Sequence, residues 1–200
     1  MTDSTEGDAA PKSPRGADKR ARLVAAARRT LHEQGIERTT LAHVAAAADI
    51  PVGNVYYYFK TKDELLAAVI ENYDGDYPML REIMGRHRTP KARLKALVRT
   101  WSAAKERIAA HGCPIGSLCS ELGKREEYDT LSRAAGDVLG QLVTIAQEQF
   151  ALLGRRDARD LALTLVGAYE GAALLANSLR DPGVLAGEAK RLERWIDSIA

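Results

Sequence analysis

The stretch from Thr39 to Leu65, TTLAHVAAAADIPVGNVYYYFKTKDEL, constrains the fold of this chain more than any other. Apolar residues recur at intervals of three and four on both sides of Pro51, and this spacing predicts two short amphipathic helices. Pro51 cannot continue the first helix, but its φ suits the start of the second. Beyond it, Thr61 followed three residues later by Glu64 forms a capping box, which predicts the start of a third helix.

The second short helix has one apolar face and one unusual outer face. The apolar spacing points these side chains inward: Val52, Val55, Tyr56 and Phe59. The outer face is small, polar and aromatic: Gly53, Asn54, Tyr57 and Tyr58. Tyrosine hydroxyls need partners or water, and a glycine costs a helix about 1 kcal/mol relative to alanine, so this is a poor helix for a core. Two helices joined by a tight turn, with such an exposed face, favour a DNA-binding helix-turn-helix over an ordinary helical hairpin. The orientation of Val52 stays ambiguous at this stage.

Cations gather around this stretch, although the chain as a whole is nearly neutral. The formal net charge of the 200 residues is +2. Between Arg15 and Lys62, however, nine Lys or Arg residues stand against four Asp or Glu residues, which leaves +5 here and −3 in the rest of the chain. A local excess of this kind is typical of a surface that contacts nucleic-acid phosphates.

Several short motifs in this region together resemble the DNA-binding domain of the tetracycline-repressor (TetR) family of transcriptional regulators. They are Thr39-Thr40-Leu41, Val44-Ala45, the run from Ala48 to Phe59, and Lys62-Asp63-Glu64-Leu65. The resemblance covers about residues 18–70. Asp49 departs from the family by replacing the usual turn glycine, which is tolerable because aspartate visits the left-handed region more readily than most residues. Pro51 replaces the usual serine and so removes a hydroxyl that could bond a phosphate.

The resemblance implies an all-α protein of about nine helices. Residues 1–16 are polar with little to bury and are predicted to be a disordered tail. Residues 17–64 would form a three-helix DNA-binding domain, and residues 65–200 a helical bundle for ligand binding and dimerisation. The expected DNA contacts are Thr39, Thr40, Pro51, Val52, Gly53, Asn54, Tyr57, Tyr58, Lys60 and Lys62. Val52, Gly53 and Asn54 are placed to meet base edges, and the tyrosines and lysines mainly phosphates.

From Gly75 onward, helical periodicity continues without strand-like alternation. A pocket for an unknown small-molecule effector is expected among these residues: Tyr73, Met84, Val98, Trp101, Leu118, Tyr128, Leu142 and Tyr169. The segment 157–179 is apolar over much of its circumference, more than one face of a monomer core can use. We therefore expect a homodimer, as the family resemblance also implies, and assign its interface to Leu161, Leu165, Gly167, Gly171, Leu175, Leu192 and Trp195.

Other functions find less support in the residues. Cys113 and Cys119 invite a metal or redox interpretation, but on a helix six residues correspond to a net rotation of about 240°, so the two thiols would diverge. Thiol sensing by these cysteines remains an alternative, as does a bundle whose tyrosines dock a protein partner. Motifs of enzymes, such as a nucleophile elbow or a phosphate-binding glycine loop, do not occur, and Glu121 and Glu170 are isolated acids that could meet in a pocket. We expect no enzyme activity, metal or cofactor. With no membrane-length apolar run and no signal-peptide core, we expect a cytoplasmic protein that binds double-stranded DNA and no membrane.

Overall fold

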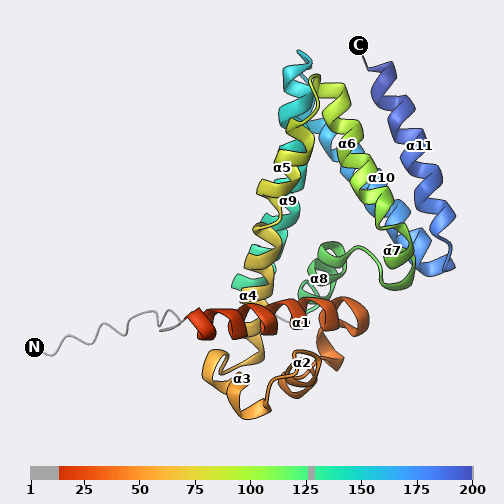
Figure 1. The fold of residues 1–200 in the computed structure, drawn as a ribbon. Coiled ribbons are helices and arrows are strands. Elements are labelled where there is room, and N and C mark those ends of the chain that lie inside the picture. Colours follow the sequence, from red (N-terminus) through yellow and green to blue (C-terminus); the bar gives the residue numbers. More distant parts are fainter. Residues whose placement is uncertain (1–13, 126–128, 200) are drawn as a thin grey trace, which may run out of the picture.

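The computed structural model describes residues 14–125 and 129–199 of the chain, and side chains from Ala17 onward. Within these residues the secondary structure consists of eleven α-helices, so the all-α prediction is confirmed. Figure 1 shows them, and their bounds are α1 Pro14–Arg38, α2 Leu41–Ala47, α3 Val52–Tyr58, α4 Lys62–Asp74, α5 Tyr77–Gly85, α6 Pro90–Ala103, α7 Lys105–His111, α8 Pro114–Leu122, α9 Thr130–Leu152, α10 Ala158–Leu179 and α11 Pro182–Ser198.

Three details of the helices add to the sequence-based expectation. Helices α6 and α7 are separated at Ala104, where φ is −97° and ψ is 9°. The stretch after Cys113 forms the regular helix α8. Helix α1 starts at Pro14, inside the predicted tail of residues 1–16, and the remainder of that tail lies outside the described residues.

Helices α1, α2 and α3 pack together at one end of the molecule (Figure 1). The Thr40 side chain caps α2 by accepting a hydrogen bond from the His43 amide at 3.1 Å. Asp49, with φ 52°, turns the chain through the left-handed region, as its position in the turn predicts. The Ile50 amide then donates to the Ala45 carbonyl at 3.0 Å, and Pro51 stands at the N-cap position of α3, which has no side-chain capping bond. The tight turn therefore holds α3 at a fixed angle to α2.

Helix α4 joins this unit to the rest of the chain. The predicted capping box is present, since Thr61 Oγ1 accepts from the Glu64 amide at 3.1 Å, while Glu64 Oε2 accepts from the Lys60 amide at 2.6 Å. One stripe of α4 is buried: Leu65, Leu66, Ala68, Val69, Ile70 and Tyr73. Because α4 packs against both α1 and α9, the predicted domain boundary at residues 64 and 65 falls inside a helix that belongs to both halves.

The remaining helices form the larger half, in which α10 packs between α9 and α11 (Figure 1). Its core includes the fully buried side chains Leu94, Leu97, Leu122, Ile145, Phe150, Leu165 and Ile196. Helix α8 lies between this half and α1, and contacts both α9 and α1. It is therefore a second connection, besides α4, between the two halves.

Candidate DNA-binding surface and ligand cavities

Helix α3 presents most of its surface to solvent. Val55 and the following Phe59 are buried and hold α3 against the helices beneath it, whereas Tyr57 is 69% exposed. Val52 and Tyr56, which the apolar spacing pointed inward, are 46% and 51% exposed. The exposure of Val52 resolves its ambiguity in favour of the outer face, where a DNA contact was expected, whereas the inward placement of Tyr56 was wrong. A seven-residue helix needs only one residue per turn to anchor it. The outer face is consequently larger than the sequence indicated.

The two threonines before α2 have different roles. Thr39 is buried, and its hydroxyl donates to the Gly35 carbonyl at 2.7 Å. It therefore joins α1 to α2 and does not face DNA, which corrects its assignment as a DNA contact. Thr40 is exposed at the N-terminus of α2, so its hydroxyl and the free amides beside it lie where a helix end can meet a phosphate.

Among the other predicted DNA contacts, Pro51, Gly53, Asn54 and Lys60 are exposed. Tyr58 is half-buried and meets the ring of Tyr57 edge-on at a centroid distance of 5.0 Å. Lys62 is also half-buried, and its Nζ donates to the Glu37 carbonyl at 3.4 Å. Tyr58 and Lys62 are thus partly engaged within the chain.

Arginines of α1 hold the DNA-binding unit together, a role that the sequence pattern did not reveal. Arg22 and Arg29 donate to the carbonyls of Ala48 and Ala47 at 2.7 and 3.1 Å, where they neutralise the negative end of α2. The guanidinium of Arg28 lies 4.0 Å from the centroid of the Tyr73 ring and also pairs with Asp76. These guanidinium groups are therefore engaged in contacts within the chain and are less free to pair with phosphates, although Arg22 and Arg29 are exposed.

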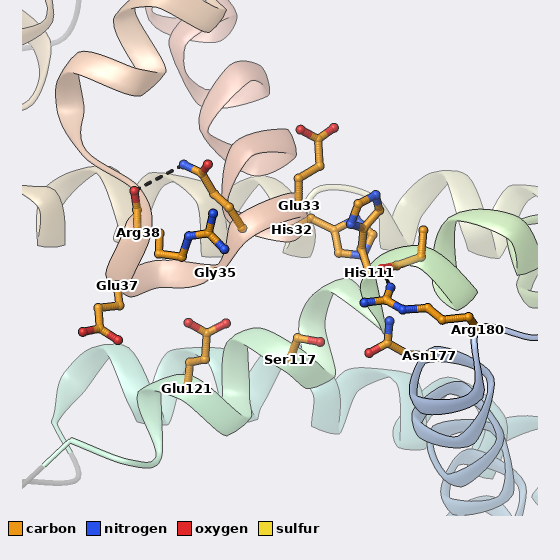
Figure 2. Close-up of a pocket in the computed structure, with 12 residues that line it drawn as sticks. His32, Glu33, Gly35, Glu37, Arg38, His111, Ser117, Glu121, Asn177 and Arg180 are labelled. Atoms are coloured by element: carbon orange, nitrogen blue, oxygen red, sulfur yellow. Dashed lines mark hydrogen bonds between the residues drawn. The ribbon is translucent and has the colours of Figure 1, made fainter.

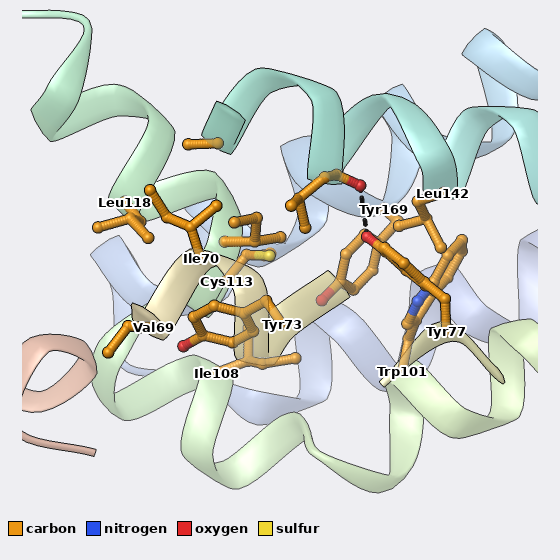
Figure 3. Close-up of a cluster of buried hydrophobic side chains, with 14 of the residues drawn as sticks. Val69, Ile70, Tyr73, Tyr77, Trp101, Ile108, Cys113, Leu118, Leu142 and Tyr169 are labelled. Atoms are coloured by element: carbon orange, nitrogen blue, oxygen red, sulfur yellow. Dashed lines mark hydrogen bonds between the residues drawn. The ribbon is translucent and has the colours of Figure 1, made fainter. Parts of the chain in front are cut away.

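The predicted effector-pocket residues that the structure describes are all buried: Tyr73, Met84, Val98, Trp101, Leu118, Leu142 and Tyr169. Figure 3 shows five of them, Tyr73, Trp101, Leu118, Leu142 and Tyr169. Tyr128 lies outside the described residues. Trp101 stacks on Tyr169 at a centroid distance of 4.2 Å, and nearby the Tyr77 hydroxyl donates to the Val138 carbonyl at 2.6 Å. Burial, together with nearby acidic and thiol groups, raises the pKa of Tyr77.

Three of these aromatic residues line a cavity of about 560 Å³ beside α1: Tyr73, Trp101 and Tyr169. Its polar lining is mostly basic, from Arg28, Arg29, His32, Arg107 and His111, with Glu33 as the acidic residue. Met84, Val98 and Leu142 line neither this cavity nor the one described next, and pack in the core.

A second cavity, of about 490 Å³, lies between α8 and α10. Its lining residues are Gly112, Cys113, Gly116, Ser117, Ser120, Glu121, Glu170, Gly171, Leu174 and Asn177. Figure 2 shows an adjoining cavity, which shares Ser117, Glu121 and Asn177 with it and reaches α1 at Gly35. The two acids that looked isolated in the sequence, Glu121 and Glu170, therefore meet in one cavity.

The cysteines are poor candidates for thiol chemistry in this conformation. Both are free thiols. Burial, with the nearby carboxylate of Glu170, raises the pKa of Cys113 to about 12 and that of Cys119 to about 11. Since the thiolate is the reactive form, both side chains are held in the unreactive state near neutral pH.

Comparisons with known proteins agree with this geometry. The family described as "Bacterial regulatory proteins, tetR family" matches residues 23–69, and the "Tetracyclin repressor-like, C-terminal domain" matches residues 90–191. The second match alone spans half of the chain. The chain belongs to the TetR family. It is therefore a member of a family of DNA-binding transcriptional regulators, as the motifs around Pro51 predicted.

The similar proteins differ in how much of this chain they cover. An uncharacterised helix-turn-helix regulator of Lactococcus lactis is 26% identical over 171 residues, 82% of this chain and 86% of that protein. The regulator BetI of Burkholderia thailandensis is 41% identical over 85 residues, 40% of this chain and 42% of that protein. A regulatory protein TetR from Rhodobacter sphaeroides superimposes with a TM-score of 0.75 at 26% identity, and covers 87% of this chain and 96% of its own. A TetR regulator from Chloroflexus aurantiacus, at 22% identity, shares the fold with a TM-score of 0.80 over 93% and 98% of the two chains.

The residues assigned to a dimer interface separate into two groups. Gly167, Gly171 and Leu175 are exposed on α10, while Leu161 is half-buried, as is Trp195 against the ring of Phe150. Leu165 and Leu192 are buried in the core of the chain itself. Periodicity could not distinguish the inward stripe of α10 from its outward one, because both are apolar. Leu165 and Leu192 therefore offer no side-chain surface to a second subunit.

The outward stripe of α10 carries four exposed leucines: Leu163, Leu174, Leu175 and Leu179. Among the described residues, α10 is also the one helix that is long and apolar enough to cross a membrane. Of its most apolar 18-residue segment, 39% is buried inside the chain. In a TetR-family protein, these same features suit a helix that packs against its own bundle on one side and a partner on the other.

Proposed function

We propose that this chain is a homodimeric transcriptional repressor that binds a palindromic operator and releases it when a small molecule binds in the larger half. The observation that carries the proposal is the outer face of α3. Gly53, Asn54 and Tyr57 are exposed there, and a Cβ at Gly53 would meet no atom of residues 14–125 or 129–199 within 4 Å. Nothing in this part of the chain requires a glycine at position 53, so we infer that a DNA backbone or base approaches it.

Two such faces, related by two-fold symmetry, would read two half-sites one turn of DNA apart. We assign the interface to the outward stripe of α10, where Gly167 and Gly171 would allow a helix of the partner to approach closely. The buried area has to be apolar for a stable dimer, and the exposed leucines that do not line the cavity between α8 and α10 supply it: Leu163, Leu175 and Leu179. As a protein that binds double-stranded DNA, it would act in the cytoplasm and bind no membrane.

An effector would act by moving α4. Helix α4 packs against α1 of the DNA-binding unit, and its Tyr73 lines the cavity of about 560 Å³. A ligand in the larger half that shifts α4 would change the separation of the two recognition helices, and operator affinity would fall. The alternative in which Cys113 and Cys119 sense oxidants is less favoured, since the raised pKa of both thiols keeps them protonated.

The proposal is tested by fluorescence anisotropy with the duplex that flanks the gene of this protein, against a random duplex of equal length. We expect preferential binding of the flanking duplex by a dimer. Asn54→Ala should reduce the preference because asparagine reads adenine edges, whereas Met79→Ala, at an exposed residue of α5, should keep it. If the wild type bound no duplex even at low salt, the protein-interaction alternative for the tyrosine face would replace this one.

A further inference from the structure

The cavity between α8 and α10 has the lining of a site for a positively charged ligand. Of its ten lining residues two are acidic, Glu121 and Glu170, and none is lysine, arginine or histidine. The neighbouring cavity beside α1 has the opposite character, with five basic residues. The adjoining cavity of Figure 2 is mixed, with Glu33, Glu37 and Glu121 beside Arg38 and Arg180. Among these three cavities, the one between α8 and α10 is therefore the one whose charged lining residues are all acidic.

Glu170 is the unusual member of the lining. Its Oε1 is buried and has no hydrogen-bond partner in the described part of the chain. A buried carboxylate oxygen left without a donor is costly, and native proteins rarely keep one without a reason. The terminal torsion of a glutamate is broad, so a small rotation would turn this oxygen toward a donor supplied from the cavity.

The surroundings of Glu170 favour a donor carried by a ligand. The chain passes close beside the carboxylate at Gly116, where a Cβ would overlap Glu170 Oε2, so the backbone of α8 packs directly against it. The Cys113 thiol of the lining hydrogen-bonds the Glu170 carboxyl group, which still leaves Oε1 without a partner. The other polar groups of the lining are the Glu121 carboxylate, the hydroxyls of Ser117 and Ser120, and the Asn177 amide, whose nitrogen donates to the Ala109 carbonyl at 3.2 Å. Gly171 and Leu174 add an apolar wall on the α10 side.

From this arrangement we infer that the cavity between α8 and α10 binds a small organic cation, such as an amine with an apolar body, and that Glu170 is its counter-ion. An ammonium group brings three donors and a positive charge, which match the acceptors and the acids of the lining. The apolar body would lie against Leu174 and Gly171. This inference deepens the proposed function and rests on it, because it names the chemical class of the effector.

The second acid connects this site to the DNA-binding unit. Glu121 Oε2 accepts from the Ile36 amide at 2.6 Å, next to the break in α1 at Gly35, where φ is 81° (Figure 2). A cation in the cavity would attract the same carboxylate. The ligand would thereby compete with the hydrogen bond that holds α8 to α1, which gives occupancy of the cavity a direct route to the DNA-binding half.

The test uses three probes with one skeleton: phenylbutylamine, phenylbutanol and phenylbutyrate, titrated into the full-length protein by calorimetry without DNA. We expect the amine to bind best. Glu170→Gln, which keeps the shape and removes the charge, should weaken amine binding by about tenfold or more and leave the alcohol unchanged. Gly116→Ala should weaken it as well by displacing the carboxylate. Glu71→Gln, at an exposed glutamate of α4, is the matched control and should bind as the wild type does.

Three results would each overturn the inference. They are equal affinity for the amine and the alcohol, no amine binding at millimolar concentration, and a Glu170→Gln variant that binds the amine as tightly as the wild type does. The same samples are assayed for binding to the flanking duplex. A protein that binds the duplex but ignores the amine retains the proposed function and loses the cation site. Glu170-dependent amine binding by a protein that ignores every duplex would retain the site and overturn the proposed function.

Discussion

At the scale of single residues, the basic side chains of the DNA-binding half differ in how free they are. Lys60 is exposed, and its Nζ makes no hydrogen bond or ion pair with the described residues, while Arg22 and Arg29 cap α2 and Lys62 donates to the Glu37 carbonyl. Lys60→Ala should therefore weaken binding to all duplexes alike and reduce the slope of log affinity against log salt by about one. Lys124→Ala, an exposed lysine after α8, should leave the slope unchanged. A slope that Lys60→Ala does not alter would show that this lysine lies away from the phosphates.

Glu170 makes a separate prediction about pH. Burial raises its pKa, with the Cys113 thiol as its close neighbour. A carboxyl group whose pKa is higher in the folded state than in the unfolded state favours folding at pH values below the unfolded pKa, and this contribution is lost as pH rises through the folded pKa. Glu170→Gln should thus raise the Tm at neutral pH and gain less at acidic pH. Thermal melts at both pH values check this, and a gain that grows toward acidic pH would contradict it.

At the scale of the elements, the sequence predicted the helix-turn-helix well because its signals are local. A proline, a left-handed turn residue and a capping box each act within four residues, and all three are found where expected. The roles of Thr39 and the α1 arginines were missed because they depend on contacts between helices far apart in sequence. The same limit explains why Leu165 was taken for an interface residue, since only the packed bundle shows which stripe of α10 faces inward.

Helix α3 can be tested through its glycine. Gly53→Ala should stabilise the free protein by up to about 1 kcal/mol, because alanine favours the helix and a Cβ meets nothing there. The same methyl group should obstruct the approach of DNA and weaken operator binding. Gly85→Ala, also with no neighbour within 4 Å of its Cβ, should leave operator binding unchanged. Tight operator binding by a stabilised Gly53→Ala protein would mean that DNA does not approach this backbone.

The alternative in which Cys113 and Cys119 sense oxidants can be tested through the reactivity of these two thiols at α8. With the pKa of Cys113 at about 12 and that of Cys119 at about 11, alkylation by iodoacetamide near pH 8 should be far slower in the folded protein than in denaturant, and should accelerate as pH rises. Replacing both cysteines with serine should preserve operator binding. If oxidant released the wild type from DNA but not the double variant, the redox reading would displace the small-molecule one.

At the scale of the whole molecule, the proposed mechanism depends on assembly. Gly167→Arg would place a charge in the centre of the proposed interface, where burying it unpaired costs several kcal/mol. We prefer it to a change at Gly171, which also borders the acidic cavity. The variant should sediment as a monomer or aggregate and lose operator binding, although α3 is untouched. Gly85→Arg, at an exposed glycine of α5, is the control. A dimeric Gly167→Arg protein with wild-type affinity would place the interface elsewhere.

The exposed leucines of α10 have a consequence for how long the protein survives in a cell. If folding is completed only when a partner covers them, the fraction of unfolded chains rises as the protomer becomes scarce. Unfolded chains are the substrates of cellular proteases, so the half-life of the protein would shorten as its synthesis falls. When synthesis of such a regulator falls, the amount of regulator in the cell would fall by a larger factor than the synthesis rate does. A modest drop in the expression of the regulator would then release the genes that it represses.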